Sequence, residues 1–504
     1  MGAEAVFHHQ PVSLLLVPFP AQGHVTPMLH LARALAAYGG VAATVAVPDF
    51  IHRRIVASND GVALACIPSG VAEDGGDTPG FAAIAHAMEN HMPAQLERVL
   101  LARRRPRFAC VVVDVLASWA VPVAERCGVP VAGFWPAMLA CYRVVAAIPE
   151  LIQKGLISES GTPISSNEQD DKEEDLVIRG LQILPEQVEL RTKDLPWLVG
   201  DKATQTSRFA FWMQTLRRAR SFRWVLVNSF HGEDDDDNGG CADDDAHRKQ
   251  PAKQSPRVLP VRPALLPAGN NVADERTKPQ QQPCSIGKSN SPSMWRADAS
   301  CIGWLDAQVA GSVVYVSFGS WVGPIGPDKV RELALGLEAS GRPFLWALKR
   351  DAAWRSGLPD GFAEAEGRGK VVDWAPQEDV LRHPAVGCYL THCGWNSTVE
   401  AIQHGVRLLC CPVAGDQFIN CAYITGLWGI GRKLDSVSRD DVKAGVERVM
   451  DDEEGRRLQE NVTALREKVV TAEARCTAEN NVTLFIDEIK REQPLLMQMY
   501  NASL

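Results

Sequence analysis

The densest collection of reactive side chains in the sequence is the stretch THCGWNSTVEA at residues 391–401. Between His392 and Thr398 it holds an imidazole, a thiol, an indole, a carboxamide and two hydroxyls. These residues make a poor metal site, because His392 and Cys393 are adjacent and no second pair of Cys or His follows at ligand spacing. They also lack the strained Gly-x-Ser-x-Gly turn that presents a serine nucleophile. Neither a metal site nor a nucleophile cluster is therefore favoured for this stretch.

The position of this stretch between two predicted elements indicates what it could bind. It follows the apolar, strand-like run AVGCYL and opens the helix-like run STVEAIQHG. Unpaired N–H groups at a helix start carry partial positive charge and bind anions. Gly394 allows a close backbone approach, and Asn396 and Ser397 can add side-chain donors. The pattern predicts a phosphate site, to which His392 could also donate.

A second interpretation of the same residues needs no ligand. Ser397 and Glu400 are spaced as a capping box, in which the two side chains satisfy the start of the helix itself. On these residues alone, the phosphate site and the capping box are both open.

Strand-like and helix-like segments alternate through both halves of the chain. The run VSLLLVP (12–18) is followed by a predicted helix over 26–40, with Thr26 and Pro27 at its start, and then by the strand-like VAATVAV. The second half repeats the alternation from SVVYVSFGS to RLLCCP. Such alternation is typical of parallel sheets covered by helices, so we expect an α/β fold with two Rossmann-like domains.

Two polar segments interrupt this pattern. Residues 231–256 carry an acidic run followed by a polar, basic one, and residues 268–293 are rich in Gln, Ser and Pro. Neither segment has the apolar side chains needed to offset its ordering entropy, so we expect both to be disordered. We place an N-terminal domain at 1–250 and a C-terminal domain at 257–480.

The bulk composition narrows the class of protein. A net charge of -9 over 504 residues argues against nucleic-acid binding. No apolar run approaches the roughly 18 residues of a membrane span, and the N-terminus lacks the pattern of a signal peptide. The thirteen cysteines are odd in number and lie mostly in apolar runs, which favours reduced thiols and a cytoplasmic protein.

The segment from Trp374 to Gln417 resembles the signature of the plant secondary-product UDP-glycosyltransferases, which are family 1 glycosyltransferases. WAPQ, VL, THCGWNST, EA, GV, P and DQ follow in order at the family spacing. PFPAQGHVTPMLHLA, VNSF and WLDAQVAGSVVYVSFGS extend the resemblance over nearly the whole chain outside the polar segments. It implies a GT-B fold, in which the two parallel sheets face a central cleft and residues 481–504 return as a helix to the N-terminal domain. The implied partners are a UDP-sugar and a small-molecule acceptor, without a metal or other cofactor, and we expect a monomer.

The resemblance also implies a role for each residue of the donor site. The uracil and ribose ligands would be Trp374, Ala375, Gln377 and Glu400. The diphosphate ligands would be Ser320, His392, Asn396 and Ser397. The sugar ligands would be Trp395, Asp416 and Gln417. Trp395 and Gln417 are the residues that users of UDP-glucose in this family show, so we expect glucose transfer. The chain departs from the family pattern at Arg262, Arg407, Cys411 and Gly415.

The proton chemistry is expected at His24 rather than in the donor stretch. His24 follows the first predicted strand in the family-like AQGHVTP, and Asp114 ends the strand-like CVVVD. In a parallel sheet both residues would lie at the same edge. A carboxylate on one imidazole nitrogen fixes the tautomer of a general base. The acceptor hydroxyl, deprotonated by His24, would then displace UDP in one step with inversion.

Two other functions are kept open. A non-catalytic UDP-sugar-binding protein would not need the pair of His24 and Asp114. An NAD(P) oxidoreductase would need a Gly-x-Gly-x-x-Gly turn after the first strand, and PFPAQGHVTP has a single glycine. Five apolar residues are candidates for an acceptor pocket, although most are expected in the core: Trp119, Trp135, Met138, Trp197 and Trp212.

Overall fold

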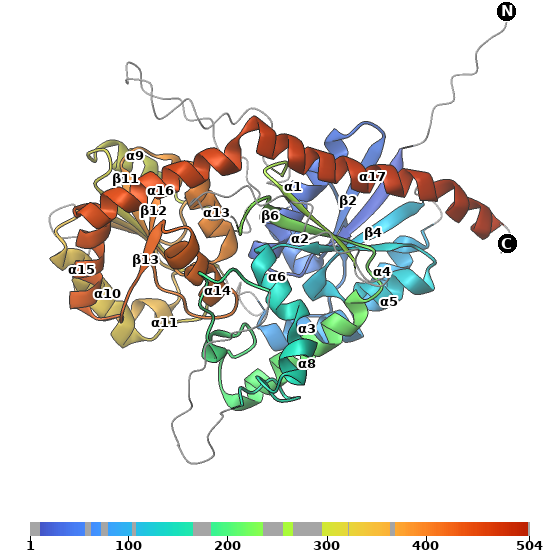
Figure 1. The fold of residues 1–504 in the computed structure, drawn as a ribbon, viewed down its shortest axis with the longest axis horizontal. Coiled ribbons are helices and arrows are strands. Elements are labelled where there is room, and N and C mark those ends of the chain that lie inside the picture. The colour runs from blue at the N-terminus through green and yellow to red at the C-terminus, as the bar shows by residue number, and fades with distance from the viewer. Residues whose placement is uncertain are drawn as a thin grey trace, which may run out of the picture.

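The chain is described from a computed structural model (Figure 1). It describes residues 11–55, 62–71, 79–102, 107–164, 183–234, 256–265, 295–320, 322–362 and 368–501, with the side chains of the last helix given up to 492. The predicted disordered segment 268–293 and most of 231–256 lie outside the described residues.

Seven parallel strands form the sheet of the N-terminal domain, in the order β3-β2-β1-β4-β5-β6-β7. The strands are β1 (Val12–Val17), β2 (Val41–Pro48), β3 (Ala63–Ile67), β4 (Phe108–Asp114), β5 (Val131–Trp135), β6 (Trp224–Phe230) and β7 (Arg257–Arg262). Strands β1 and β4 pair in the middle of the sheet, with Leu15 opposite Val111. Helices cover both faces of a parallel sheet, which explains why β1, β4 and β6 are largely apolar and are buried along their whole length.

The helices of the N-terminal domain include the one that carries His24. The helical segments are α1 (Gln22–Ala37), α2 (Asp49–Ile55), α3 (Phe81–Asn90), α4 (Met92–Leu100), η2 (Val115–Ala117), α5 (Ala120–Arg126), α6 (Leu139–Ala146), α7 (Ile148–Gln153), η3 (Thr192–Asp194) and α8 (Lys202–Ala219). The prediction that the first helix begins at 26 is wrong, because α1 begins at Gln22 and contains Pro27. Proline has no N–H, so the carbonyl of Gly23, four residues earlier, lacks its helical partner. His24 therefore lies in the first turn of α1, beside a carbonyl that is free to accept a hydrogen bond from outside the helix.

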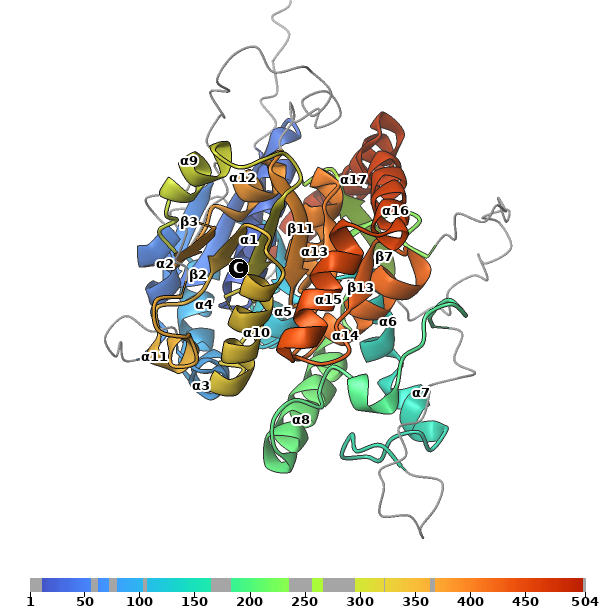
Figure 2. The ribbon, with the colours of Figure 1, turned by 90° about the vertical axis from the view of Figure 1, so that its left-hand side faces the viewer.

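Six parallel strands form the second sheet, in the order β10-β9-β8-β11-β12-β13. The strands are β8 (Val313–Ser317), β9 (Phe344–Ala347), β10 (Gly369–Val372), β11 (Val386–Thr391), β12 (Arg407–Cys410) and β13 (Gly431–Lys433). The helical segments are α9 (Ser300–Asp306), α10 (Pro327–Ala339), α11 (Ala352–Arg355), α12 (Gln377–Arg382), α13 (Trp395–His404), α14 (Gln417–Ala422), the π-helical turn η4 (Tyr423–Leu427), α15 (Arg439–Met450), α16 (Glu453–Val470) and α17 (Ala472–Asn501). Helices α10 and α15 lie side by side on this sheet (Figure 2). The expectation of two parallel-sheet α/β domains is confirmed.

Helix α17 links the two domains. It runs from the C-terminal domain along the N-terminal domain (Figure 1), where it contacts β4, β6 and β7. Its Phe485 is fully buried and packs edge-on against Trp224 of β6. The helix starts before the segment 481–504 that was expected to return to the N-terminal domain.

Two predicted boundaries need correction. The start of the C-terminal domain at 257 is wrong, because β7 (Arg257–Arg262) is the edge strand of the N-terminal sheet. The polar segment was placed too early at 231, because residues 231–234 form a turn in which Glu233 is buried. Among the described helices, none is both long enough and apolar enough to cross a membrane.

Candidate active site

The predicted pair of His24 and Asp114 lies in contact at the carboxyl edge of the N-terminal sheet. His24 Nδ1 is 2.7 Å from Asp114 Oδ2. The carboxylate is completely buried, and it also accepts the backbone N–H groups of Phe19 and Leu116. The imidazole is partly exposed and packs against the Phe19 ring, with the ring centroids 5.0 Å apart. A fixed carboxylate on one nitrogen orients the ring and leaves Nε2 for proton transfer.

The start of α13 has the geometry of an anion site and not of a capping box. The helix begins at Trp395 with Gly394 as its N-cap, and no side chain caps it. Glu400 therefore lies in the second turn, too far along to bond the helix start, and the capping-box interpretation is wrong. The first-turn N–H groups of a helix without a side-chain cap are available to an anion. Cys393, before the N-cap, has a left-handed φ of 63° that turns the chain sharply from β11 into α13.

Gln377 joins the predicted ribose ligands into one network. Its Nε2 donates to Ser397 Oγ at 3.0 Å and to Glu400 Oε2 at 2.8 Å. Its Oε1 accepts from the hydroxyls of Tyr315 and Tyr389. Burial raises the pKa of Glu400 to about 7, against the opposing hydrogen bond from Gln377. The structure thus brings Gln377, Ser397 and Glu400 together, and the four hydrogen bonds fix the amide orientation of Gln377.

His392 is held in a narrow slot between two glycines. A Cβ atom at Gly319 would lie 2.7 Å from His392 Cε1, and a Cβ atom at Gly394 would lie within 3.0 Å of both Nε2 and Cε1 of the same ring. Burial lowers the pKa of His392 to about 4, although a hydrogen bond to the backbone of Ser317 opposes this shift. The ring is therefore neutral near pH 7, and its Nδ1 has no partner among the described atoms.

The two domains meet through the predicted diphosphate and sugar ligands. Asn396 Nδ2 donates to the Gly23 carbonyl at 2.9 Å, which is the carbonyl that Pro27 leaves unpaired. Trp395 Nε1 donates to the Asn228 carbonyl at 2.6 Å, and its ring stacks on Phe230. The start of α13 is thereby tied directly to the residue before His24.

Asn228 on β6 is a hydrogen-bonding centre that the sequence did not single out. Its Nδ2 donates to the Pro136 carbonyl and to Asn396 Oδ1, and its Oδ1 accepts from Arg262 Nε at 2.7 Å. Arg262 is one of the departures from the family pattern, and its guanidinium is buried. Burial lowers the pKa of Arg262 to about 10, while the nearby carboxylates of Glu400 and Glu378 oppose the shift. Arg262 thus stays charged, donates a hydrogen bond to Asn228 and interacts electrostatically with the carboxylate of Glu400.

Replacing Asn228 by alanine is expected to lower the free energy of unfolding by about 2–5 kcal/mol, because three hydrogen bonds are lost and a buried charged donor on Arg262 is left unpaired. Chemical denaturation measures this change. Asn481→Ala is the matched control, because Asn481 makes one partly buried hydrogen bond, to the Pro260 carbonyl, worth about 1 kcal/mol. An equal loss in both variants would show that Asn228 is not a centre of the interface.

The predicted sugar ligands Asp416 and Gln417 lie at the start of α14. Gln417 is buried, and its Oε1 accepts the N–H groups of Val413 and Ala414, so its Nε2 stays available as a donor. Burial raises the pKa of Asp416, while a hydrogen bond from Asn420 and the field of His24 lower it. That electrostatic interaction indicates that Asp416 and His24 lie near each other, although they belong to different domains.

The remaining predicted ligands line the loops beside α12 and β8. Trp374 is partly exposed and lies 5.9 Å from the Trp295 ring, tilted by 33°. Ala375 is buried beside it. Lys349 Nζ donates to the carbonyl of Ser320, and burial lowers the pKa of Lys349 to about 8. Lys349 was not predicted, and it holds the loop that carries Ser320.

A second contact between the domains contains a titratable carboxylate. Glu233 accepts the N–H groups of Leu139 and Ala140 at the start of α6 and the hydroxyl of Ser229. Burial raises its pKa to about 7. Its carbonyl also accepts from Trp428 Nε1 of the C-terminal domain at 3.0 Å.

The raised pKa of Glu233 predicts a pH-dependent stability. The folded state favours the protonated carboxyl of Glu233. Its contribution to the free energy of unfolding is therefore complete below the unfolded pKa of about 4.5 and is lost as pH rises to about 7. Glutamine does not titrate, so Glu233→Gln does not lose this contribution. The difference in unfolding free energy between Glu233→Gln and wild type is therefore expected to shift in favour of the variant by up to about 3 kcal/mol across this range. Altered hydrogen bonds add a difference that does not depend on pH. Denaturation at pH 5 and pH 8 measures it. A difference between variant and wild type that does not change with pH would contradict the assignment.

Comparisons with known proteins agree with this architecture. The family model described as UDP-glucoronosyl and UDP-glucosyl transferase matches residues 296–467, and a model for the glycosyltransferase N-terminal domain matches residues 10–62. UDP-glycosyltransferase 82A1 of Arabidopsis thaliana is 45% identical over 491 residues, covering 95% of this chain and 99% of the relative. The DIMBOA UDP-glucosyltransferase BX9 of Zea mays is 32% identical, covering 89% of each chain.

Solved structures show the same arrangement of domains. A UDP-glucosyltransferase from Polygonum tinctorium superposes with a TM-score of 0.74 at 25% identity, covering 96% of this chain and 99% of that one. Os79 from O. sativa, in complex with UDP, gives a TM-score of 0.73 at 25% identity, covering 94% of this chain and 100% of that one. Neither the oxidoreductase nor the non-catalytic alternative is supported by these matches. The chain belongs to the plant UDP-glycosyltransferase family and has its GT-B fold.

Proposed function

We propose that this chain transfers glucose from UDP-glucose to a hydroxyl group of a lipophilic small molecule, with inversion at the anomeric carbon. The observation that carries the proposal is the contact between Asn396 and Gly23. This contact brings the start of α13 next to His24, which supports the roles proposed here: His24 as the general base and the start of α13 as the site of the leaving diphosphate. Relatives named as glucosyltransferases support the choice of sugar.

The proposed reaction uses His24 on the N-terminal side of this contact and the start of α13 on the C-terminal side. His24 Nε2 would take the proton of the acceptor hydroxyl, and Asp114 would stabilise the resulting imidazolium. The acceptor oxygen forms a bond to the anomeric carbon as the bond from that carbon to UDP breaks. The backbone N–H groups at the start of α13, with Asn396 and Ser397, would stabilise the charge on the departing diphosphate.

The sugar and nucleotide roles of the predicted ligands are part of the same proposal. Trp374 is exposed enough to stack on uracil, and Gln417 offers its Nε2 to a sugar hydroxyl. Trp395 is proposed to act through its position beside the sugar, because its indole N–H is bonded to Asn228. The described cysteines are free thiols, which supports a cytoplasmic location.

The lipophilic acceptor is inferred from an aromatic series that starts at His24. Phe19 packs on His24, Phe81 on Phe19, Phe211 on Phe81 and Trp212 on Phe211, each within 6.4 Å between ring centroids. Phe81, Phe211 and Trp212 are only partly buried. Of the five sequence candidates, four lie in the core: Trp119, Trp135, Met138 and Trp197.

The test is turnover of UDP-glucose, UDP-galactose and UDP-glucuronate with a panel of phenols and alcohols, followed by NMR of the product. The expected result is a β-glucoside, formed fastest with aromatic acceptors. An α-linked product would contradict the inverting mechanism, and UDP binding without any turnover would favour the non-catalytic alternative. Size-exclusion chromatography tests the prediction of a monomer.

A further inference from the structure

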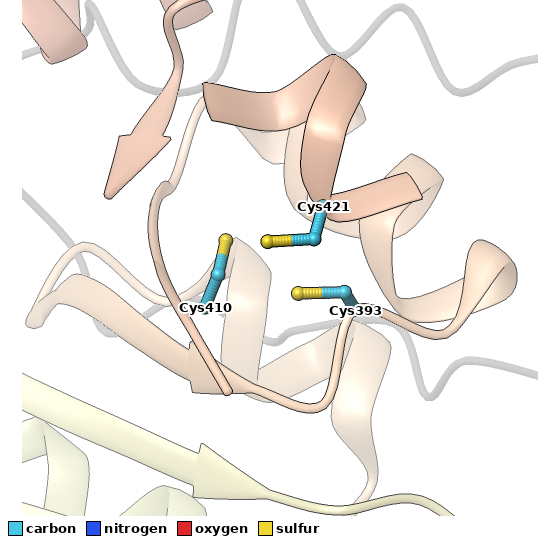
Figure 3. Close-up of side chains that lie close together, drawn as sticks. All are labelled: Cys393, Cys410 and Cys421. Atoms are coloured by element: carbon cyan, nitrogen blue, oxygen red, sulfur yellow. The ribbon is translucent and has the colours of Figure 1, made fainter. Parts of the chain in front are cut away.

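Three cysteine side chains from separate segments of the C-terminal domain meet in one buried group, here called the trithiol cluster. Cys393 lies in the turn between β11 and α13, Cys410 ends β12, and Cys421 lies in α14. Their sulfur atoms converge (Figure 3) and lie within 4.8 Å of one another. Within the described ranges this is the one group of three or more His, Cys or acidic side chains that could share an ion. It adjoins the proposed donor site without being assigned any role in it.

Burial and mutual hydrogen bonds shift the pKa values of the three thiols in different directions. Burial raises the pKa of Cys393 and Cys410 well above the ordinary value. Hydrogen bonds with these two thiols lower the pKa of Cys421, which makes Cys421 the first of the three to lose its proton.

The number and type of the ligands limit which ion fits. A zinc site with Zn–S bonds of about 2.3 Å normally has four ligands, and the described residues supply three here. A divalent ion with three thiolates also carries a net negative charge, which is costly to bury without a counterion. A trivalent ion with three thiolates is neutral, so it suits a buried three-sulfur group best.

We propose that the trithiol cluster binds a trivalent thiophilic ion, and that arsenite is the ligand class it takes. The reaction is As(OH)3 plus three Cys–SH, giving As(S–Cys)3 and three water molecules. Three As–O and three S–H bonds break, and three As–S and three O–H bonds form. The oxidation state of arsenic does not change and no proton is released, so no oxidant or base is required.

Binding of arsenite to the trithiol cluster would distort the proposed donor site and so weaken the binding of UDP-glucose. Cys393 lies between His392 and Gly394, and Cys421 is on the same short helix as Gln417. Asn420 Nδ2 donates to the Cys393 carbonyl at 2.9 Å, which couples α14 to the turn. Drawing the sulfur atoms to bonding distance would therefore shift both segments. This consequence rests on the proposed donor roles, and by linkage bound UDP-glucose would weaken arsenite binding by the same factor.

A thiol count tests the binding itself without any use of activity. Reduced protein is incubated with arsenite, freed of excess reagent and unfolded, and its reactive thiols are counted. Wild type has thirteen cysteines, and three are expected to be blocked, with mass spectrometry showing one arsenic gained. Unchanged reactivity of all thirteen thiols would overturn the proposal.

Matched variants locate the site. Cys421→Ala and Cys410→Ala are each expected to weaken arsenite binding at least tenfold, while Cys388→Ala, which removes a buried thiol of β11 outside the cluster, leaves it unchanged. A smaller loss in both cluster variants, with thermal unfolding showing that they are folded, would overturn the assignment. Tighter binding of Zn²⁺ or Cd²⁺ than of arsenite would overturn the charge argument. If arsenite blocks the three thiols without weakening UDP binding, the proposed donor role of these segments fails instead.

Discussion

Replacing His24 by alanine is expected to lower kcat about 10³-fold, with little change in the KM for UDP-glucose. Positioned general bases contribute about 10²–10⁴-fold to a rate, and His24 is the partly exposed imidazole that Asp114 orients. The donor ligands lie on the other domain and keep their contacts. Initial rates with a phenol acceptor at saturating UDP-glucose measure the effect.

Acceptors of different acidity distinguish a histidine that acts as a general base from one with only a structural role. An acceptor that is already ionised at assay pH, such as 4-nitrophenol, needs no general base and is expected to lose much less activity in His24→Ala. Asp114→Asn should follow the same pattern with a loss of about 10²-fold, because the imidazole loses its fixed orientation. Equal losses for ionised and neutral acceptors would sink the assignment of His24 as the base.

Replacing Gly394 by alanine is expected to weaken UDP binding about 100-fold, or about 2.7 kcal/mol. The backbone of Gly394 has a φ of -63°, which alanine adopts freely, so the new methyl group acts only by its collision with His392. The buried imidazole must move, and with it the start of α13. Isothermal titration calorimetry with UDP measures the change, and an affinity within about threefold of wild type would contradict this account.

Alanine substitutions at two further glycines distinguish the effect of collision with His392 from the effect of backbone strain. Gly341 has a φ of 66° and open space around it, so Gly341→Ala adds only strain, of about 1–2 kcal/mol in stability. Gly319 has a φ of 71° and also faces His392, so Gly319→Ala combines both effects. UDP binding should weaken in Gly319→Ala and stay unchanged in Gly341→Ala. A loss of UDP affinity in Gly341→Ala would show that a general loss of stability weakens UDP binding, and collision with His392 would then not be needed to explain the effect of Gly394→Ala.

Local sequence predicted the alternation of strands and helices and placed His24 and Asp114 at the same sheet edge, and the family resemblance identified the two residues as a pair. Buried parallel strands are continuous apolar runs, and ligand-binding residues in such sheets follow the carboxyl ends of the strands. The ends of β1, β4 and β11 therefore indicated where the site residues would lie. The start of α1 was mispredicted because Pro27 was given the first helical position. The structure shows that its missing N–H instead frees the Gly23 carbonyl for Asn396.

What the sequence did not predict depends on contacts between distant segments. Asn228 and Arg262 acquire their roles only when β6, β7 and α13 meet. Glu233 looked like part of a solvated acidic run, yet its carboxylate satisfies the start of α6. The spacing of Cys and His along the chain did not reveal the trithiol cluster, because three separate segments assemble it.

The path of α17 has a consequence for how the protein is made on the ribosome. Phe485, Val482 and Ile486 of this helix complete the core of the N-terminal domain, against strands that are synthesised long before it. The N-terminal sheet therefore emerges with Trp224 and its neighbours uncovered, and it stays so while the whole C-terminal domain is translated. The first domain cannot finish folding before the second, so nascent chains are expected to need chaperone protection until α17 is released from the exit tunnel.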